Sequence, residues 1–420
     1  MLKKVFLLMM ASLLCCCLSF ADELTKDELI QKLTQRVEQL EKKVEELNKK
    51  QGVYENISGS SEEVIQKKVE DALAKKEEQS GGLAKALKSI TLSGFVDAAY
   101  TYNFNRLNSG TNTARVFDTE PNSFTLQAAK IALEKLPTPE DRVGFRTDVL
   151  FGQDAKIIKP YGWNTDDVNL EQAYADILFP PGKGLDVKAG KFVTLAGAEV
   201  IESKDNWNFS RSLLFGYAIP FTHTGLRASY PLMDNLTGFF GVNNGWDDIK
   251  DNNKGKSFET ALAYTVSDKL SFNLTGIFGP EQPSNNHSNR ALVDFVATYK
   301  PFEKITLKLN TDYGHEDDAV APGKNGEWAG IAGYIRYDVN NWLSFSNRTE
   351  YFSDPQGLRV VAGTPQDLWE NTLTTEVRPF KNIITRLEYR YDASSKDVFT
   401  KNETPIDHQS TIAAEAIYIF

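Results

Sequence analysis

The stretch His408–Phe420, HQSTIAAEAIYIF, decides the fold, because its alternation predicts a β-strand that runs to a terminal aromatic residue. One face is apolar and consists of Ile412, Ala414, Ala416, Tyr418 and Phe420. The other face is mixed, with Glu415 among Thr411, Ala413, Ile417 and Ile419. Termini of soluble domains usually fray, so we interpret this stretch as the closing strand of an outer-membrane β-barrel. The alternative is an ordinary half-buried strand.

Length and composition limit the possibilities. The chain has 420 residues, of which 25% are charged and 11% aromatic, and its formal net charge is −10. This length fits one very large domain or two ordinary ones. Beyond the N-terminus no apolar run is long enough for a membrane helix, so a membrane location requires alternating strands. The negative balance argues against nucleic acid as a partner.

Residues 1–21 have the form of a secretory signal, with Lys3 and Lys4 before an apolar core and a small-residue site at Ser19–Ala21. All three cysteines, Cys15, Cys16 and Cys17, lie in this segment, so the remainder has no disulfide framework. A lipoprotein signal is the alternative, although the leucines before the cysteines fit that motif poorly. With either signal the product leaves the cytoplasm.

Residues 22–50 predict a coiled coil. The apolar positions recur at alternating three- and four-residue steps and form a narrow heptad seam: Ile30, Leu33, Val37, Leu40, Val44 and Leu47. Such a stripe favours self-association over an amphipathic helix lying on its own domain. The residue choice leans towards two strands and does not fix the oligomer.

Residues 51–88 predict a periplasmic linker with a second helix. Gly52 and the stretch 56–61 break the coil, Ser60 or Ser61 caps the helix, and Gly81-Gly82 ends it. A disordered linker is the alternative, because the apolar content is low.

From residue 89 to residue 420 the period changes to two, which predicts an antiparallel up-and-down barrel of about sixteen strands. We expect strands at 90–104, 124–135, 142–151, 169–179, 185–192, 222–230, 236–243, 257–266, 270–278, 289–299, 304–314, 327–338, 342–352, 367–378, 383–392 and 408–420. Short connections such as 340–341 alternate with long ones such as 193–221, 315–326 and 393–407. This alternation is typical of outer-membrane barrels, with short periplasmic turns and long outer loops.

The two faces of the expected strands differ in polarity. In 383–392, Leu387, Tyr389 and Tyr391 alternate with Arg386, Glu388 and Arg390. The apolar face suits lipid, and the charged face suits a water-filled lumen rather than a dry core. A barrel of about this size leaves an aqueous channel.

No catalytic, cofactor or metal constellation is present in the sequence. The four histidines match no ligand spacing, and there is no nucleophile elbow or phosphate loop. We therefore expect a protein that is not an enzyme and holds no cofactor or metal.

The connection 193–221 is the best functional candidate, because a long loop carrying Leu213, Leu214, Phe215 and Tyr217 should not lie in solvent. If it folds into the barrel it narrows the pore, and fixed charges there select ions. The pore-lining candidates are Glu199, Glu202, Lys204, Asp205, Arg211, Arg227, Arg386 and Arg390. Alternatively the loop packs on top of the barrel or at a subunit interface, and Arg211 is an anchor that pairs with Glu199 or Asp205.

Several segments match a known family, most densely Gln172-Ala173-Tyr174, Gly190-Lys191-Phe192, 208–212 (NFSRS), 223–227 (HTGLR) and Asn244-Gly245-Trp246, with further matches at 93–105, 122–126 and 143–146. Through these segments the chain resembles the OmpL-like outer-membrane β-barrel porins over about residues 90–420. The resemblance implies an outer-membrane channel of undefined substrate, and it supplies no catalytic residues. The N-terminal coil lies outside it.

We therefore expect a porin in the outer membrane of a diderm bacterium that passes small hydrophilic solutes or ions, with its coil in the periplasm. Besides membrane lipid, the expected partners are copies of the same chain, with a trimer favoured by analogy with other coil-bearing porins, and peptidoglycan as a further candidate. The first alternative is a non-conducting structural or adhesin-type barrel, and the second is an outer-membrane enzyme.

Overall fold

The computed structural model describes residues 89–107 and 110–420. The predicted signal (1–21), coiled coil (22–50) and linker (51–88) lie outside the described residues. In the described part of the chain, no helix is both long and apolar enough to cross a bilayer.

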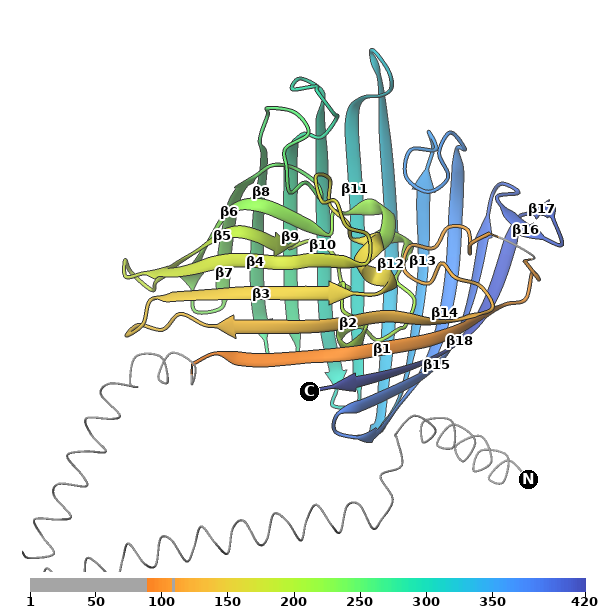
Figure 1. Ribbon diagram of the computed structural model, residues 1–420, viewed down its shortest axis with the longest axis horizontal. Helices are drawn as coiled ribbons and strands as arrows, with labels where there is room; N and C mark the ends of the chain where they lie inside the picture. The colour runs from red at the N-terminus through yellow and green to blue at the C-terminus, as the bar shows by residue number, and fades with distance from the viewer. Residues whose placement is uncertain (1–88, 108–109) are drawn as a thin grey trace, which may run out of the picture. The chain divides into compact units, whose positions relative to one another are not determined.

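Sixteen of the described strands form one closed barrel in which neighbours are antiparallel (Figure 1). They are β1 (Thr91–Asn103), β2 (Ser123–Lys135), β3 (Val143–Phe151), β4 (Val168–Phe179), β5 (Leu185–Val193), β6 (Thr222–Met233), β7 (Leu236–Asn243), β8 (Ser257–Ser267), β9 (Leu270–Pro280), β10 (Asn289–Phe302), β11 (Ile305–Ala321), β12 (Lys324–Asn340), β13 (Leu343–Asp354), β14 (Gln366–Phe380), β15 (Ile383–Ser394) and β18 (His408–Ile419). Each strand pairs with the next along the chain, and β18 returns to β1. The predicted up-and-down barrel of about sixteen strands is confirmed.

The stretch from which the fold was predicted closes the barrel. Strand β18 lies between β15 and β1, with Phe95 opposite Ile419 (Figure 1). Beyond the strand, the Gly94 N–H donates to the Phe420 carbonyl at 2.9 Å, and the Phe420 N–H donates to the Gly94 carbonyl at 3.0 Å. A Cβ on Gly94 would lie 2.3 Å from the Lys130 carbonyl oxygen and 2.5 Å from Cζ of Phe420, so only glycine fits between the β2 backbone and the terminal ring.

The two faces of the strands separate as expected. On β15, Arg386, Glu388, Arg390 and Asp392 are buried inside the barrel, while Leu387, Tyr389 and Tyr391 are exposed on its outer surface. This alternation places charges in the lumen and apolar side chains towards lipid.

The two ends of the barrel also differ. Turns at 180–184, 234–235, 268–269, 303–304, 341–342 and 381–382 lie at one end, here named the turn end, where β1 begins and β18 finishes. The other end, here named the loop end, carries the long connections.

Three predicted connections contain structure that the sequence analysis missed. The predicted long loop 315–326 is wrong: β11 and β12 continue to a tight turn at which Gly323 has a φ of +74°. The connection 393–407 contains a hairpin of β16 (Phe399–Lys401) and β17 (Thr404–Ile406). The connection 152–168 begins with the short helix α4 (Gln153–Ile157).

Candidate pore constriction

Residues 193–221, here named the inner loop, run from the end of β5 to the start of β6 and fold into the barrel. The loop contains a short 3₁₀ turn, η1 (Ser203–Asp205), and one turn of π-helix, η2 (Leu214–Ala218). Its backbone and side chains bond to lumen-facing groups on β2, β11, β12, β13, β14, β15 and β18. The loop therefore crosses the lumen instead of lying above the barrel.

Two lumen-facing carboxylates bind the loop backbone in the same way. Glu350 on β13 accepts hydrogen bonds from the Leu213 and Leu214 N–H groups at 2.6 and 3.2 Å. Glu388 on β15 accepts from the Phe209 and Ser210 N–H groups at 2.7 and 3.0 Å. A carboxylate that receives two backbone N–H groups satisfies donors that would otherwise be buried without partners.

A buried arginine fixes the same stretch. The Arg348 guanidinium contacts the Glu199 carboxylate at 2.8 Å and the Glu370 carboxylate at 2.6 Å, and it donates to the Ser210 carbonyl at 2.6 Å. The Arg348 and Glu370 side chains are 0% exposed and that of Glu199 is 5% exposed. The inner loop is therefore joined to β13 and β14 through an ion-pair network shielded from water.

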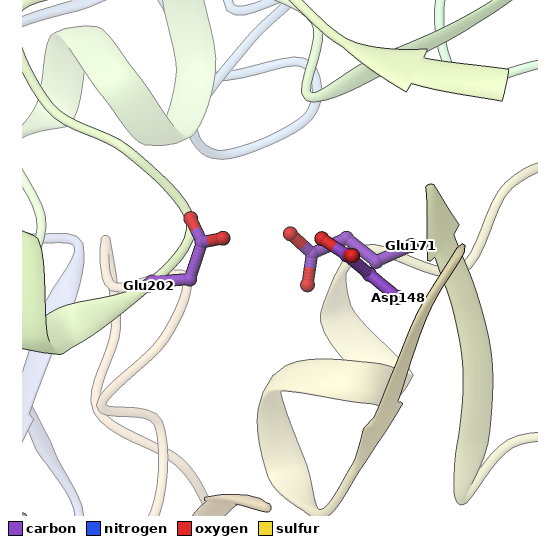
Figure 2. Close-up of side chains that lie close together, drawn as sticks. All are labelled: Asp148, Glu171 and Glu202. Carbon is purple, nitrogen blue, oxygen red and sulfur yellow. The ribbon is translucent and has the colours of Figure 1, made fainter. Parts of the chain in front are cut away.

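Three carboxylates gather on the opposite wall. Asp148 on β3 and Glu171 on β4 project from the barrel, and Glu202 of the inner loop faces them (Figure 2). Their spacing would suit a metal ion, but the Lys130 ammonium from β2 lies 2.8 Å from Asp148 Oδ2 and 2.9 Å from Glu171 Oε1, and it also contacts Glu202. A cation already occupies this position, so the cluster is a second anchor of the inner loop.

The Lys130 contact sets the ionisation of Glu202. Burial opposes the charged form of this carboxyl, but the neighbouring Lys130 ammonium outweighs burial and lowers the pKa of Glu202 below its usual value. Glu202 is therefore ionised at neutral pH.

The predicted pore-lining residues of the inner loop lie in two environments. Glu199 and Arg211 are buried between the loop and the wall. Lys204 and Asp205 pair with each other at 2.5 Å, and their side chains remain 27% and 54% exposed. Arg211 does not pair with Glu199 or Asp205: it donates to the Phe209 carbonyl at 2.6 Å and lies 3.6 Å from Asp154 on α4.

The three predicted arginines on the wall pair with wall carboxylates rather than across the opening with the acids of the inner loop. Arg227 binds Glu259 at 2.7 Å, Arg386 binds Glu376 and Glu415 at 2.9 Å, and Arg390 binds Asp392 at 2.8 Å. Each also donates to an inner-loop carbonyl: Val193 for Arg227, Ser203 and Asn206 for Arg386, and Arg211 for Arg390.

Glu388 was placed on the charged lumen face from the sequence, but Lys130, Arg348, Glu350 and Glu388 were not named as pore candidates, although all four contact the inner loop. The two-residue period places such residues in the lumen. It could not have selected them from the other lumen charges.

Aromatic side chains fill the space between the inner loop and the loop end. Phe117 of the connection 104–122 packs with Phe215 and Phe221 of the inner loop, with ring centroids 5.4–5.8 Å apart. Phe117 and Phe215 are only 1% and 2% exposed. This part of the lumen is packed like a protein core, so any continuous path must pass beside the cluster.

A cation stacked on indole rings joins a further connection to the inner loop. Arg359, in the connection 355–365, lies 4.8 Å from the Trp328 ring centre and 5.4 Å from that of Trp246. Its Nε donates to the Tyr217 carbonyl at 2.7 Å. Several loop-end connections thus support the inner loop from above.

The geometry of a sixteen-stranded barrel with an infolded loop agrees with the family comparison. The family model described as "Putative beta-barrel porin-2, OmpL-like" matches residues 89–420. The chain belongs to this porin family. The resemblance stated from the sequence is confirmed, and the protein is a porin of the outer membrane. No curated protein matches the chain by sequence.

Solved outer-membrane proteins share the fold of this porin at low sequence identity. An anion-selective porin from Comamonas acidovorans has a TM-score of 0.55 at 12% identity and covers 79% of this chain and 99% of its own. OprB of Pseudomonas putida has a TM-score of 0.54 at 12% identity, covering 81% and 97%. The channel DcaP of Acinetobacter baumannii has a TM-score of 0.53 at 13% identity, covering 79% and 97%. Family membership favours the expected channel over the enzyme alternative.

Proposed function

We propose that this porin passes small hydrophilic solutes or ions by passive diffusion and that the inner loop sets the width and selectivity of the path. The observation that supports this proposal is the fixed position of the loop across the lumen, held by Arg348, Glu350 and Glu388 on one wall and by Lys130 on the other. A rigid crossing segment with charged groups on both sides is what ion selection requires.

The first test is the conductance of the refolded mature protein, residues 22–420, in a planar bilayer. Discrete current steps that grow in proportion to salt concentration would support an open aqueous path. A folded barrel that carries no current would favour the second candidate, a non-conducting structural or adhesin-type barrel. The packed aromatic cluster of Phe117, Phe215 and Phe221 supports this second candidate, because it fills part of the lumen.

Replacing Glu202 with glutamine should shift the channel towards anions. The substitution removes one negative charge beside a cavity of about 150 Å³ that is lined by Lys130, Arg146 and Lys204. Because less negative charge then offsets these three cations, they should attract anions more strongly. The measurement is the reversal potential in a salt gradient, and an unchanged value would place the conducting path away from Glu202. Asp234→Asn, which removes a negative charge from an exposed pair with Lys183 outside this cavity, is the control.

We further propose that the segment 22–50 associates copies of the chain in the periplasm, with a trimer favoured, and that 1–21 is a signal removed on export. The trimeric form of OmpT from Vibrio cholerae, with a TM-score of 0.53 at 12% identity, is a barrel of the same fold that assembles in threes. Peptidoglycan is the alternative partner of the coil.

Deleting residues 22–50 should lower the oligomer mass in detergent while the barrel stays folded, because the predicted heptad seam is lost. Light scattering after size exclusion measures the mass, and heat-modifiable gel migration reports the folded barrel. An unchanged oligomer mass would show that the barrel itself associates the copies. An unchanged monomer mass would show that the chain does not associate.

A further inference from the structure

A cavity of about 600 Å³ opens at the turn end, and none of its lining residues belongs to the Lys130 cluster. It lies where β11, β12, β13 and β14 meet their turns and is lined by charged groups of both signs, among them Glu303, Lys304, Arg336, Asp338, Glu376 and Arg378. Its volume falls within the range of pockets that hold small molecules.

The inner part of this cavity is saturated with ion pairs. The Glu376 side chain is 2% exposed and accepts from Arg336 at 3.0 Å, from Arg378 at 2.9 Å and from Arg386 at 2.9 Å. Asp338 accepts from Arg336 Nε at 2.8 Å. These carboxylates fix the guanidinium groups in place, and Glu376 has little capacity left for a solute.

The outer part of the cavity keeps unused groups of both signs. Arg378 uses only its Nε towards Glu376, and its side chain is 40% exposed. Lys304 Nζ donates to the Val339 carbonyl at 2.8 Å and forms no ion pair with a described residue. Glu303 is exposed and has no cation within ion-pair distance in the described part of the chain, and Asp338 is 41% exposed.

The balance of charges decides the class of ligand. Among the lining residues, Lys304, Arg336 and Arg378 carry three positive charges, while Glu303, Asp338 and Glu376 carry three negative ones. A site with no net charge gives little preference to a simple anion or cation. It does suit a molecule with both an anionic and a cationic group, because each finds an unused partner.

We propose that this cavity binds small zwitterions of the amino-acid type, with the carboxylate at Arg378 and Lys304 and the ammonium at Glu303 and Asp338. Trp342 and Leu343, which also line the cavity, provide apolar surface for a side chain. The site would give the proposed channel a solute class, and a role of the site in transport rests on the proposed channel function. The binding itself does not require conduction.

Binding of L-leucine to the refolded mature protein in detergent, measured by calorimetry, tests the site. The comparison ligands are its two halves: 4-methylpentanoate, which lacks the ammonium, and 3-methylbutylamine, which lacks the carboxylate. We expect each half to bind at least about tenfold more weakly than leucine, since one charged contact is lost in each. Equal binding of leucine and 4-methylpentanoate would overturn the zwitterion assignment in favour of an anion site.

Two variants assign the contacts. Arg378→Gln and Glu303→Gln should each weaken leucine binding about tenfold. Lys183→Gln, in an exposed pair with Asp234 at the same end of the barrel, is the control and should leave binding unchanged. A folded barrel that conducts but binds no leucine would overturn this site and leave the channel proposal standing. A barrel that binds leucine but conducts nothing would support this site and overturn the channel proposal.

Discussion

Replacing Arg348 with methionine will destabilise the barrel by about 3–5 kcal/mol, the usual cost of removing one partner from a buried ion pair. The substitution removes the buried cation that pairs with Glu199, leaves Glu370 with only Arg390 at 3.3 Å, and removes a donor to the Ser210 carbonyl. The inner loop should then be held less rigidly at β13, where its hydrogen bonds to Glu350 remain. Denaturant unfolding of the refolded protein measures the loss, and a wider single-channel step would accompany it if the loop limits the pore.

Two further variants separate a buried-charge effect from a general loss of stability. Lys183→Met removes the cation of an exposed ion pair, in which the Lys183 and Asp234 side chains are 46% and 98% exposed. This variant should lower the free energy of unfolding by less than about 1 kcal/mol. Adding Glu370→Leu to Arg348→Met should restore part of the lost stability, because one of the two carboxylates that lost the Arg348 cation disappears. If the double variant is less stable than the single one, repulsion between stranded carboxylates is not the cause.

The strands were predictable because each one is specified locally. A residue that faces lipid must be apolar and its neighbour in the lumen need not be, so most strand segments of the sequence show a two-residue period. The predicted segment 236–243 coincides with β7, and 383–392 differs from β15 only at its end. The error at 315–326 has the same origin: beyond the membrane no lipid imposes the alternation, and β11 and β12 continue as a hairpin with little pattern to mark them.

The contacts of the inner loop could not be predicted in the same way. The apolar residues of 193–221 indicated that the loop needs cover, and it does fold into the barrel. Its partners are far away in the sequence, as with Glu199 and Arg348, which are 149 residues apart. The lumen face offers arginines at many equivalent positions, and only the path of the loop backbone decides that Arg348 pairs with Glu199 while Arg386 and Arg390 bind loop carbonyls.

Removing Phe420 will reduce the amount of folded barrel in the outer membrane about tenfold, which corresponds to about 1.4 kcal/mol. The deletion breaks the two backbone hydrogen bonds between Phe420 and Gly94 that close the seam between β18 and β1. In lipid, the freed Gly94 groups find no water to replace them, so the edge of the barrel opens. Heat-modifiable migration of outer-membrane fractions measures the folded protein.

The ring and the backbone of Phe420 contribute separately to this effect, and Phe420→Ala distinguishes them. This variant keeps both seam hydrogen bonds and loses only a ring that is 50% exposed and stacks 6.1 Å from Tyr418, so we expect a smaller loss than on deletion. Phe380, at the end of β14 and away from the seam, is 65% exposed. Phe380→Ala should therefore change the amount of folded barrel little. If Phe420→Ala is as defective as the deletion, the terminal aromatic ring matters in its own right during insertion. If neither variant loses folded protein, the pairing of β18 with β1 up to Ile419 is sufficient to close the barrel.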